Sequence, residues 1–193
     1  MATSTTTTQV SSQRNRALET ATQIAIIVAA SFFVALCARI YIPLPGTPVP
    51  LTVQNLGVLL IGLALGPRRG FIALALYLAE GVSGLPVFSP SGLGGLAQIL
   101  GPTGGYLIAY PFVAALTGYI FEHGKSSFAR AAFASLAGEI LLFAFGVSWL
   151  YVLTHSLFRA LSFGLYWFVF AEILKVMVAA GIVRSWKVFF PHT

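Results

Sequence analysis

The sequence predicts an all-α integral membrane protein with six transmembrane helices and both termini in the cytoplasm. Of its 193 residues, 58% are hydrophobic and only 8% are charged, whereas a typical soluble domain has about 25% charged residues. The hydrophobic residues form apolar runs, and about 20 such residues cross a bilayer as a helix. The basic residues lie between the runs. The chain is therefore expected to have the lipid bilayer as its main solvent, and a water-soluble enzyme is disfavoured.

The expected spans are residues 18–41, 51–66, 69–86, 103–122, 130–153 and 164–186. The second and third are short and are joined only by Gly66-Pro67-Arg68-Arg69-Gly70, which predicts a tight helical hairpin. Residues 1–17 are rich in Ser and Thr, so we expect a disordered cytoplasmic tail there. The transmembrane domain then covers residues 18–187, and residues 188–193 form a cytoplasmic C-terminal tail.

The basic residues set the expected orientation, because cytoplasmic loops are enriched in Lys and Arg. Eight basic residues fall on the inner side: Arg14, Arg16, Arg68, Arg69, Lys125, Arg130, Arg184 and Lys187. The outer side has only Arg39 and Arg159. This distribution also accounts for the net charge of +6 without a nucleic-acid partner. The two longest loops then face outward.

These two outer loops have a composition that favours a folded cap. IPLPGTPVPLTVQNLG (42–57) is stiffened by four prolines, and GLPVFSPSGLGGLAQILGPTGG (84–105) is rich in glycine with apolar residues between. Irregular backbone at a membrane is tolerated where it packs on protein or lines a water-filled cavity. We expect a lid that includes Pro45, Pro48, Gly94 and Gly95. A flexible external loop is the alternative for the second segment. A phosphate-binding loop is disfavoured there because residues 84–105 contain no G-K-[ST].

Two charged residues in the last expected span are the strongest candidates for a site. Glu172 and Lys175 are three residues apart and so share one helix face. They could form an ion pair that only packs. We favour ligand binding, because an apolar pair would pack as well without the cost of desolvation. A carboxylate and an ammonium suit a ligand with hydrogen-bond donors and an anionic end.

Three further polar residues lie in the outer halves of the expected spans. Gln54 can donate and accept at once, which suits a ligand with N–H and C=O groups, although it could simply lie in the first turn behind a cap at Thr52. Tyr77 and Tyr106 either bind ligand or belong to the interfacial aromatic belt. Asn55 is expected to point to a different side of the helix from Gln54.

Two features have no clear role from the residues alone. Glu139, within the fifth expected span, could pair with a basic group or take up a proton, and the sequence identifies no partner. Ala21, Ala25 and Ala29 form a small-residue stripe that allows close helix approach. The stripe either packs against the protein's own helices or docks another membrane subunit.

Enzyme chemistry is hard to assemble from this sequence. H-E-x-x-H, G-x-S-x-G and nucleotide-hydrolysing motifs are missing, and the lone Cys37 lies in an apolar run. We therefore expect no catalytic site, no metal and no cofactor. Energy for any transport must come from elsewhere.

The segments IPLPGTPVPLTVQNLG, LGPRRG, YLAEGVSGLPVF and GGLAQILGPTGGYL, in this order, resemble the BioY family. These proteins are the biotin-capturing substrate subunits (S components) of energy-coupling-factor (ECF) importers. The resemblance covers about residues 20–186. It implies a six-helix S-component fold in a bacterial inner or plasma membrane, with biotin held near the outer face. It also implies a transmembrane coupling subunit and two ATPase subunits as partners.

The resemblance also implies residue roles. The family's polar residue near the start of span two matches Gln54, and its Asp-x-x-Lys motif falls on Glu172 and Lys175. The docking stripe matches Ala21 and Ala25, with Ala29 as an extension. Glu in place of Asp lengthens the acidic arm by one methylene.

A second departure concerns the glycine-rich loop, where Ser91-Gly92-Leu93-Gly94 lacks the arginine that some relatives have. Lys175 is then the expected partner of the biotin carboxylate. The expected function is biotin capture and translocation. The alternative is a self-contained, proton-coupled transporter for biotin or a related small carboxylate, with Glu139 or Glu172 as proton carrier.

Overall fold

The structure is a computed structural model that describes the backbone of residues 3–189 and the side chains of residues 15–185. It is mainly helical, as the sequence predicts. The helices are α1 (Thr3–Cys37), α2 (Gln54–Val82), α3 (Gly95–Leu100), α4 (Gly104–Glu122), α5 (Phe128–Thr154), α6 (Leu157–Leu161), the π-helical η1 (Ser162–Tyr166) and α7 (Val169–Phe189). Two short strands, β1 (Tyr41–Ile42) and β2 (Leu51–Thr52), pair antiparallel.

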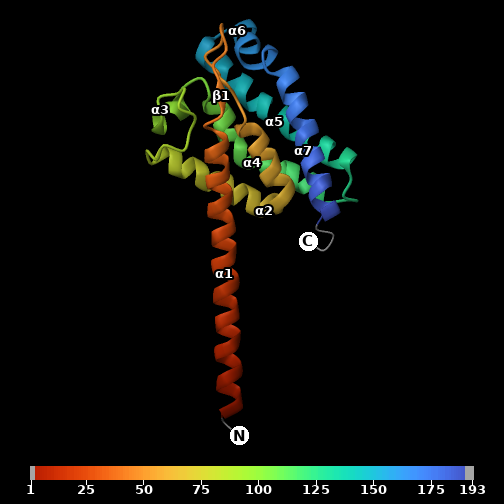
Figure 1. Cartoon of the computed structure of the whole chain (residues 1–193). Coiled ribbons are helices and arrows are strands. Elements are labelled where there is room, and N and C mark those ends of the chain that lie inside the picture. Colours follow the sequence, from red (N-terminus) through yellow and green to blue (C-terminus); the bar gives the residue numbers. More distant parts are fainter. Residues whose placement is uncertain (1–2, 190–193) are drawn as a thin grey trace.

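The helices form one bundle from which α1 protrudes (Figure 1). The α1 helix runs up one side and leads into β1 at the far end, where α6 also lies. The α7 helix returns toward the end from which α1 protrudes. This arrangement agrees with two termini on the same side of a membrane, and it groups β1 and α6 on the side expected to face outward.

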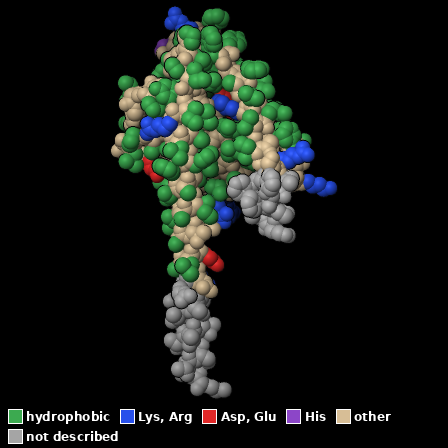
Figure 2. Space-filling view, viewed as in Figure 1, with side chains coloured by type: hydrophobic (Ala, Val, Ile, Leu, Met, Phe, Trp, Pro, Cys, Tyr) green, Lys and Arg blue, Asp and Glu red, His purple; other side chains and the backbone are tan. Residues whose placement is uncertain are grey.

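Several helices are suited to a bilayer by length and composition. Within the described residues these are Asn15–Cys37, α2, α4 and α5. The bent pair Leu157–Tyr166 and Val169–Ser185 can form a fifth span, which is broken in the middle. Hydrophobic side chains cover much of the visible surface of the bundle, and few charges interrupt them (Figure 2). The protein is therefore a multi-pass membrane protein.

The α2 helix contains the hairpin expected between the second and third spans. Gly66 breaks it with φ 75° and ψ −178°. The Gln54 Nε2 atom donates a hydrogen bond of 2.8 Å to the Tyr77 hydroxyl, although these residues would lie about 35 Å apart along a straight helix. The arms 54–65 and 67–82 therefore fold back on each other, which confirms the predicted hairpin. Each arm corresponds to one of the six expected spans.

Replacing Gly66 with Ala should destabilise the fold by about 1–3 kcal/mol, because this backbone conformation is essentially restricted to glycine. An added Cβ would also collide with the Glu122 carboxylate. The measurement is the thermal unfolding midpoint in detergent. The matched control is Gly181→Ala, since a Cβ there meets nothing within 4 Å. Equal midpoints for the two variants would contradict this account of the hairpin.

The first expected boundary needs a correction. Residues 3–17 continue α1 as a helix, where the Ser/Thr-rich composition predicts a disordered tail. An α-helix pairs its own backbone N–H and C=O groups, so it can continue through a stretch of polar side chains. Within the residues whose side chains are described, the candidate membrane span of α1 covers Asn15–Cys37. Residues 1–2 and 190–193 of the two expected tails lie outside the described residues.

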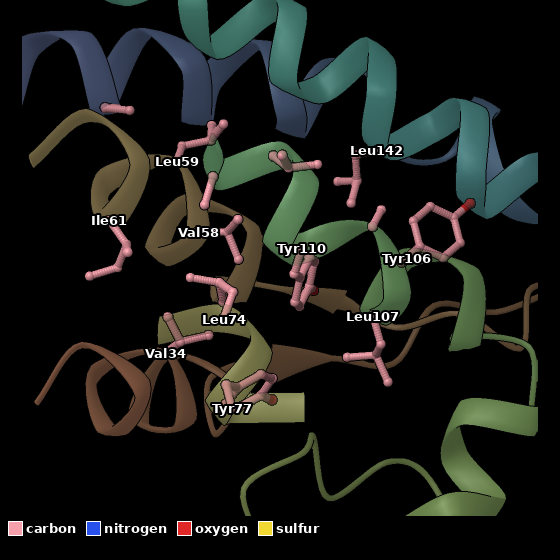
Figure 3. Close-up of a cluster of buried hydrophobic side chains, with 14 of the residues drawn as sticks. Val34, Val58, Leu59, Ile61, Leu74, Tyr77, Tyr106, Leu107, Tyr110 and Leu142 are labelled. Carbon is pink, nitrogen blue, oxygen red and sulfur yellow. The ribbon is translucent and has the colours of Figure 1, made fainter. Parts of the chain in front are cut away.

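The core lies where α2, α4 and α5 meet. Leu59, Leu74, Tyr77 and Leu142 are almost fully buried, and Figure 3 shows them with Tyr106 and Tyr110 in one cluster. The α2 and α4 backbones approach closely at Gly62, where an added Cβ would lie 2.6 Å from the Ala114 carbonyl oxygen. This close packing gives the outer ends of α2 and α4 a fixed geometry.

Candidate functional site

A cavity lies between the two outer loops and the outer ends of the helices. The empty space in and around it, part of which is open solvent, is about 490 Å³. Its lining comes from the proline loop and β2, the start of α2, the second loop with α3, and helices α4, α5 and α7. The lining residues are Val49, Pro50, Thr52, Gln54, Asn55, Ser89, Gln98, Thr103, Tyr106, Leu107, Tyr110, Phe143, Phe168 and Glu172.

The proline loop forms one wall of the cavity. The β1–β2 pair closes the loop at its base, with Tyr41 opposite Thr52. The Thr47 hydroxyl donates a hydrogen bond of 2.6 Å to the Phe163 carbonyl, so the tip is fastened to η1. Pro45 and Pro48 are exposed and do not line the cavity; Val49 and Pro50 do. The two expected prolines are thus part of the loop but not of the cavity wall.

The second outer loop forms the opposite wall around a buried glutamine. The Gly94 N–H donates to Gln98 Oε1 at 3.1 Å, and Gln98 Nε2 donates to the Ser89 carbonyl at 3.5 Å. A Cβ on Gly92 would collide with Gln98. The segment is therefore a folded cap. Gly94 and Gly95 supply its positive φ angles of 71° and 58°, while Ser89 and Gln98 reach the cavity.

The last span is broken, whereas the sequence predicts one helix over 164–186. The chain passes through α6 and η1 and then restarts at Val169, with a bend of 41°. The break is stabilised because Tyr106 donates a hydrogen bond of 2.7 Å to the Gly164 carbonyl, next to the carbonyl that Thr47 binds. Glu172 therefore lies in the first turn of α7, where the helix dipole favours a negative charge.

Glu172 lies at the centre of a buried polar chain. Its side chain is 3% exposed, and Oε1 accepts hydrogen bonds from Lys175 Nζ at 2.7 Å and from Asn55 Nδ2 at 3.1 Å. The Tyr110 hydroxyl donates to Asn55 Oδ1 at 2.8 Å. The chain therefore joins α4, α2 and α7, and presents an amide and a carboxylate to the cavity.

Asn55 and Tyr110 are the two members of this polar chain that the sequence reasoning missed. Asn55 was expected to point away from the side of Gln54, yet both line the cavity, because the cavity wraps around the first turn of α2. Tyr110 follows Tyr106 by four residues and so shares its helix face. That spacing is the signal that could have identified Tyr110.

Gln54, which is 2% exposed, lines the cavity as expected. Tyr77 lies behind it. The Tyr77 hydroxyl accepts from Gln54 Nε2 and donates to the Val87 carbonyl at 3.0 Å. Tyr77 therefore orients Gln54 and fastens the second loop, and it has no place in the lining itself.

Lys175 also lies behind the cavity, and its ammonium pairs with Glu172. Its side chain is 12% exposed. Among the described residues, no three His, Cys, Asp or Glu side chains gather as metal ligands would. The charges at the site are thus those of a carboxylate and an ammonium.

The alanine stripe lies on the outer surface of α1. Ala21, Ala25 and Ala29 are exposed, whereas Ala30 and Val34 on another face are buried in the core. The stripe is therefore free of the protein's own packing. Docking of another membrane subunit, the second alternative from the sequence, stays a prediction.

Comparisons with known proteins agree with this fold. The profile described as the BioY family matches residues 6–192. "Biotin transporter BioY" of Rhizobium etli is 37% identical over 170 residues, which are 84% of this chain and 90% of that protein. "Biotin transporter BioY" of Thermotoga maritima is 36% identical over 162 residues, 84% of this chain and 95% of that protein.

A solved structure has the same fold. It is described as the S-component for biotin from an ECF-type ABC transporter, and it matches with a TM-score of 0.79 and 28% identity over 88% of this chain and 92% of that one. The expected S-component fold is therefore confirmed. Family match, close relatives and fold together show that this chain is a member of the BioY family.

Proposed function

We propose that this protein is the biotin-binding S component of an ECF-type importer in a bacterial plasma membrane. It captures biotin at the outer face and delivers it inside with an ATPase-driven partner module. The observation that carries the proposal is the buried chain Tyr110–Asn55–Glu172–Lys175 beneath a cavity capped by two folded outer loops. The names of the relatives and of the matching structure support the choice of biotin.

The lining of the cavity complements the chemistry of biotin. A cyclic urea offers two N–H donors and one carbonyl acceptor, which suit the Glu172 carboxylate and the amides of Asn55 and Gln54. Leu107, Phe143 and Phe168 provide apolar surface for the fused ring and the alkyl chain. The ligand carboxylate then lies toward the mouth, beside neutral donors of the two loops.

The first test is direct binding. We expect the purified chain to bind biotin with one-to-one stoichiometry in detergent without ATP, because the cavity is complete within this one chain. Isothermal titration calorimetry at micromolar biotin gives the stoichiometry, with size-exclusion chromatography to show that the protein is folded. Folded protein that gives neither heat nor competition with labelled biotin would overturn the assignment.

The proposed partners are a transmembrane coupling subunit and two ATPase subunits, with the alanine stripe as the docking surface on this chain. A second candidate, a self-contained proton-coupled transporter, is favoured by one observation, the buried carboxyl of Glu139. Uptake into proteoliposomes separates the two. Biotin uptake that needs the ATPase module supports the first, and uptake driven by a pH gradient with this chain alone supports the second.

A further inference from the structure

Glu139 is a buried acid next to the site that the proposed function leaves unused. It lies in the middle of α5 and is only 3% exposed. Among the described residues, neither of its carboxyl oxygens has a hydrogen-bond partner. Oε2 of Glu172 has none either. The charged groups that act on the Glu139 carboxyl from the facing helix α7 are the Glu172 carboxyl and the Lys175 ammonium. Two carboxyl groups can share a hydrogen bond only if one of them has a proton.

The charges around the two carboxyls bear on which of them holds a proton. Both carboxylates with one ammonium would leave a net negative charge in the membrane interior, which is costly. Glu172 has the Lys175 ammonium at 2.7 Å, an Asn55 amide at 3.1 Å and the N-terminal turn of α7. Glu139 has none of these, since it lies in mid-helix. A buried carboxyl without its own cation takes up a proton and becomes neutral.

The remaining group that acts on Glu139 does not change this charge balance. Besides Glu172 and Lys175 of α7, it is the Tyr110 hydroxyl of α4. The Tyr110 hydroxyl already donates to Asn55 Oδ1, so it has no proton left for Glu139. Within α5 itself, Ser135 lies one turn away and is also buried without a partner. Glu172 is thus the acceptor that the geometry offers.

We propose that Glu139 is protonated and donates a hydrogen bond to Oε2 of Glu172, which makes it a positioning residue for the biotin site. This inference rests on the proposed function. The bond satisfies the remaining oxygen of Glu172 and fixes the carboxylate toward the cavity. With one proton on the pair, Glu139, Glu172 and Lys175 are together neutral. The floor of the cavity therefore selects a neutral head group with N–H donors, such as a cyclic urea, over an anionic one.

The binding test compares two substitutions of Glu139. Glu139→Gln keeps an N–H donor but cannot titrate, so biotin affinity at neutral pH should stay within about threefold of the wild type. Glu139→Leu removes the donor and should lower affinity on the order of tenfold or more, as expected for loss of a hydrogen bond to a charged group. At alkaline pH the wild type should lose affinity as the shared proton leaves, and Glu139→Gln should not. Glu19→Gln, at an exposed acid of α1, is the control. Equal binding by Glu139→Leu and the wild type would overturn the proposal.

A second measurement needs neither ligand nor the Leu variant. Infrared spectra of the ligand-free protein at neutral pH should contain the carbonyl stretch of a protonated carboxylic acid. Glu139→Gln should lose this band and Glu19→Gln should keep it. If the wild type lacks the band, Glu139 is ionised and the inference fails even if biotin binds. If the band is present but biotin does not bind, the proposed function fails and the protonated pair stands.

Discussion

Replacing Glu172 with Gln should weaken binding of biotin and of biotin amide alike, by about ten- to a hundredfold. The carboxylate is the charged acceptor that faces the cavity, and losing a hydrogen bond to a charged group costs about 1.5–3 kcal/mol. The variant also leaves the Lys175 ammonium buried without its counter-ion. Both ligands offer the same urea to this residue, so both should lose by the same factor in calorimetric titration.

Lys175→Met, tested with the same two ligands, separates two roles for the lysine. The sequence suggests that Lys175 neutralises the biotin carboxylate, which would make the loss much greater for biotin than for its amide. In the structure its ammonium lies 2.7 Å from Glu172, and the residue is not part of the lining. We therefore expect equal losses for the two ligands. A much larger loss for biotin would show that Lys175 turns to the ligand carboxylate.

Replacing Ala25 with Trp should abolish assembly with the coupling subunit while biotin affinity stays unchanged. Ala25 is exposed on α1, away from the cavity, and a small-residue stripe works by letting two helix backbones come close. An indole would hold them apart. Co-purification of tagged subunits measures assembly, and calorimetry of the isolated chain measures binding.

The control for that experiment is Ile24→Trp. Ile24 is 56% exposed and already large, and it lies about 100° around the helix from Ala25. Assembly should survive this change. If Ala25→Trp removed biotin binding together with assembly, the stripe would have to pack inside the protein. If both Trp variants assembled normally, the docking surface would lie elsewhere.

The parts of the fold that depend on local properties could be predicted from the sequence. Apolar runs identify membrane helices wherever they occur, and Gly66-Pro67 marks the hairpin because glycine alone adopts the required backbone angles. Glu172 could be recognised as a candidate because a charge in an apolar run is costly. Gln54 was proposed because its amide can donate and accept at once, and it lies in the cavity lining.

The parts of the fold that depend on contacts between residues distant in the sequence could not be predicted. The last helix breaks where Thr47 and Tyr106 donate hydrogen bonds to the carbonyls of Phe163 and Gly164. No local sequence pattern predicts these hydrogen bonds. Asn55 was set aside because helix geometry separates neighbouring residues, although the cavity reaches both. The helical start of α1 was missed because composition describes burial, whereas a helix satisfies its backbone internally.

The neutral lining of the cavity has a consequence for how fast the ligand is captured. Glu172 is the single formally charged residue among the described lining, and Lys175 offsets it. Charged clefts accelerate the arrival of oppositely charged ligands, and this advantage disappears as salt screens it. The lining itself therefore contributes little attraction for an anion, so substituting its neutral residues should leave the salt dependence of capture unchanged. Any attraction of an anionic ligand toward the cavity would then have to come from charged residues outside the lining.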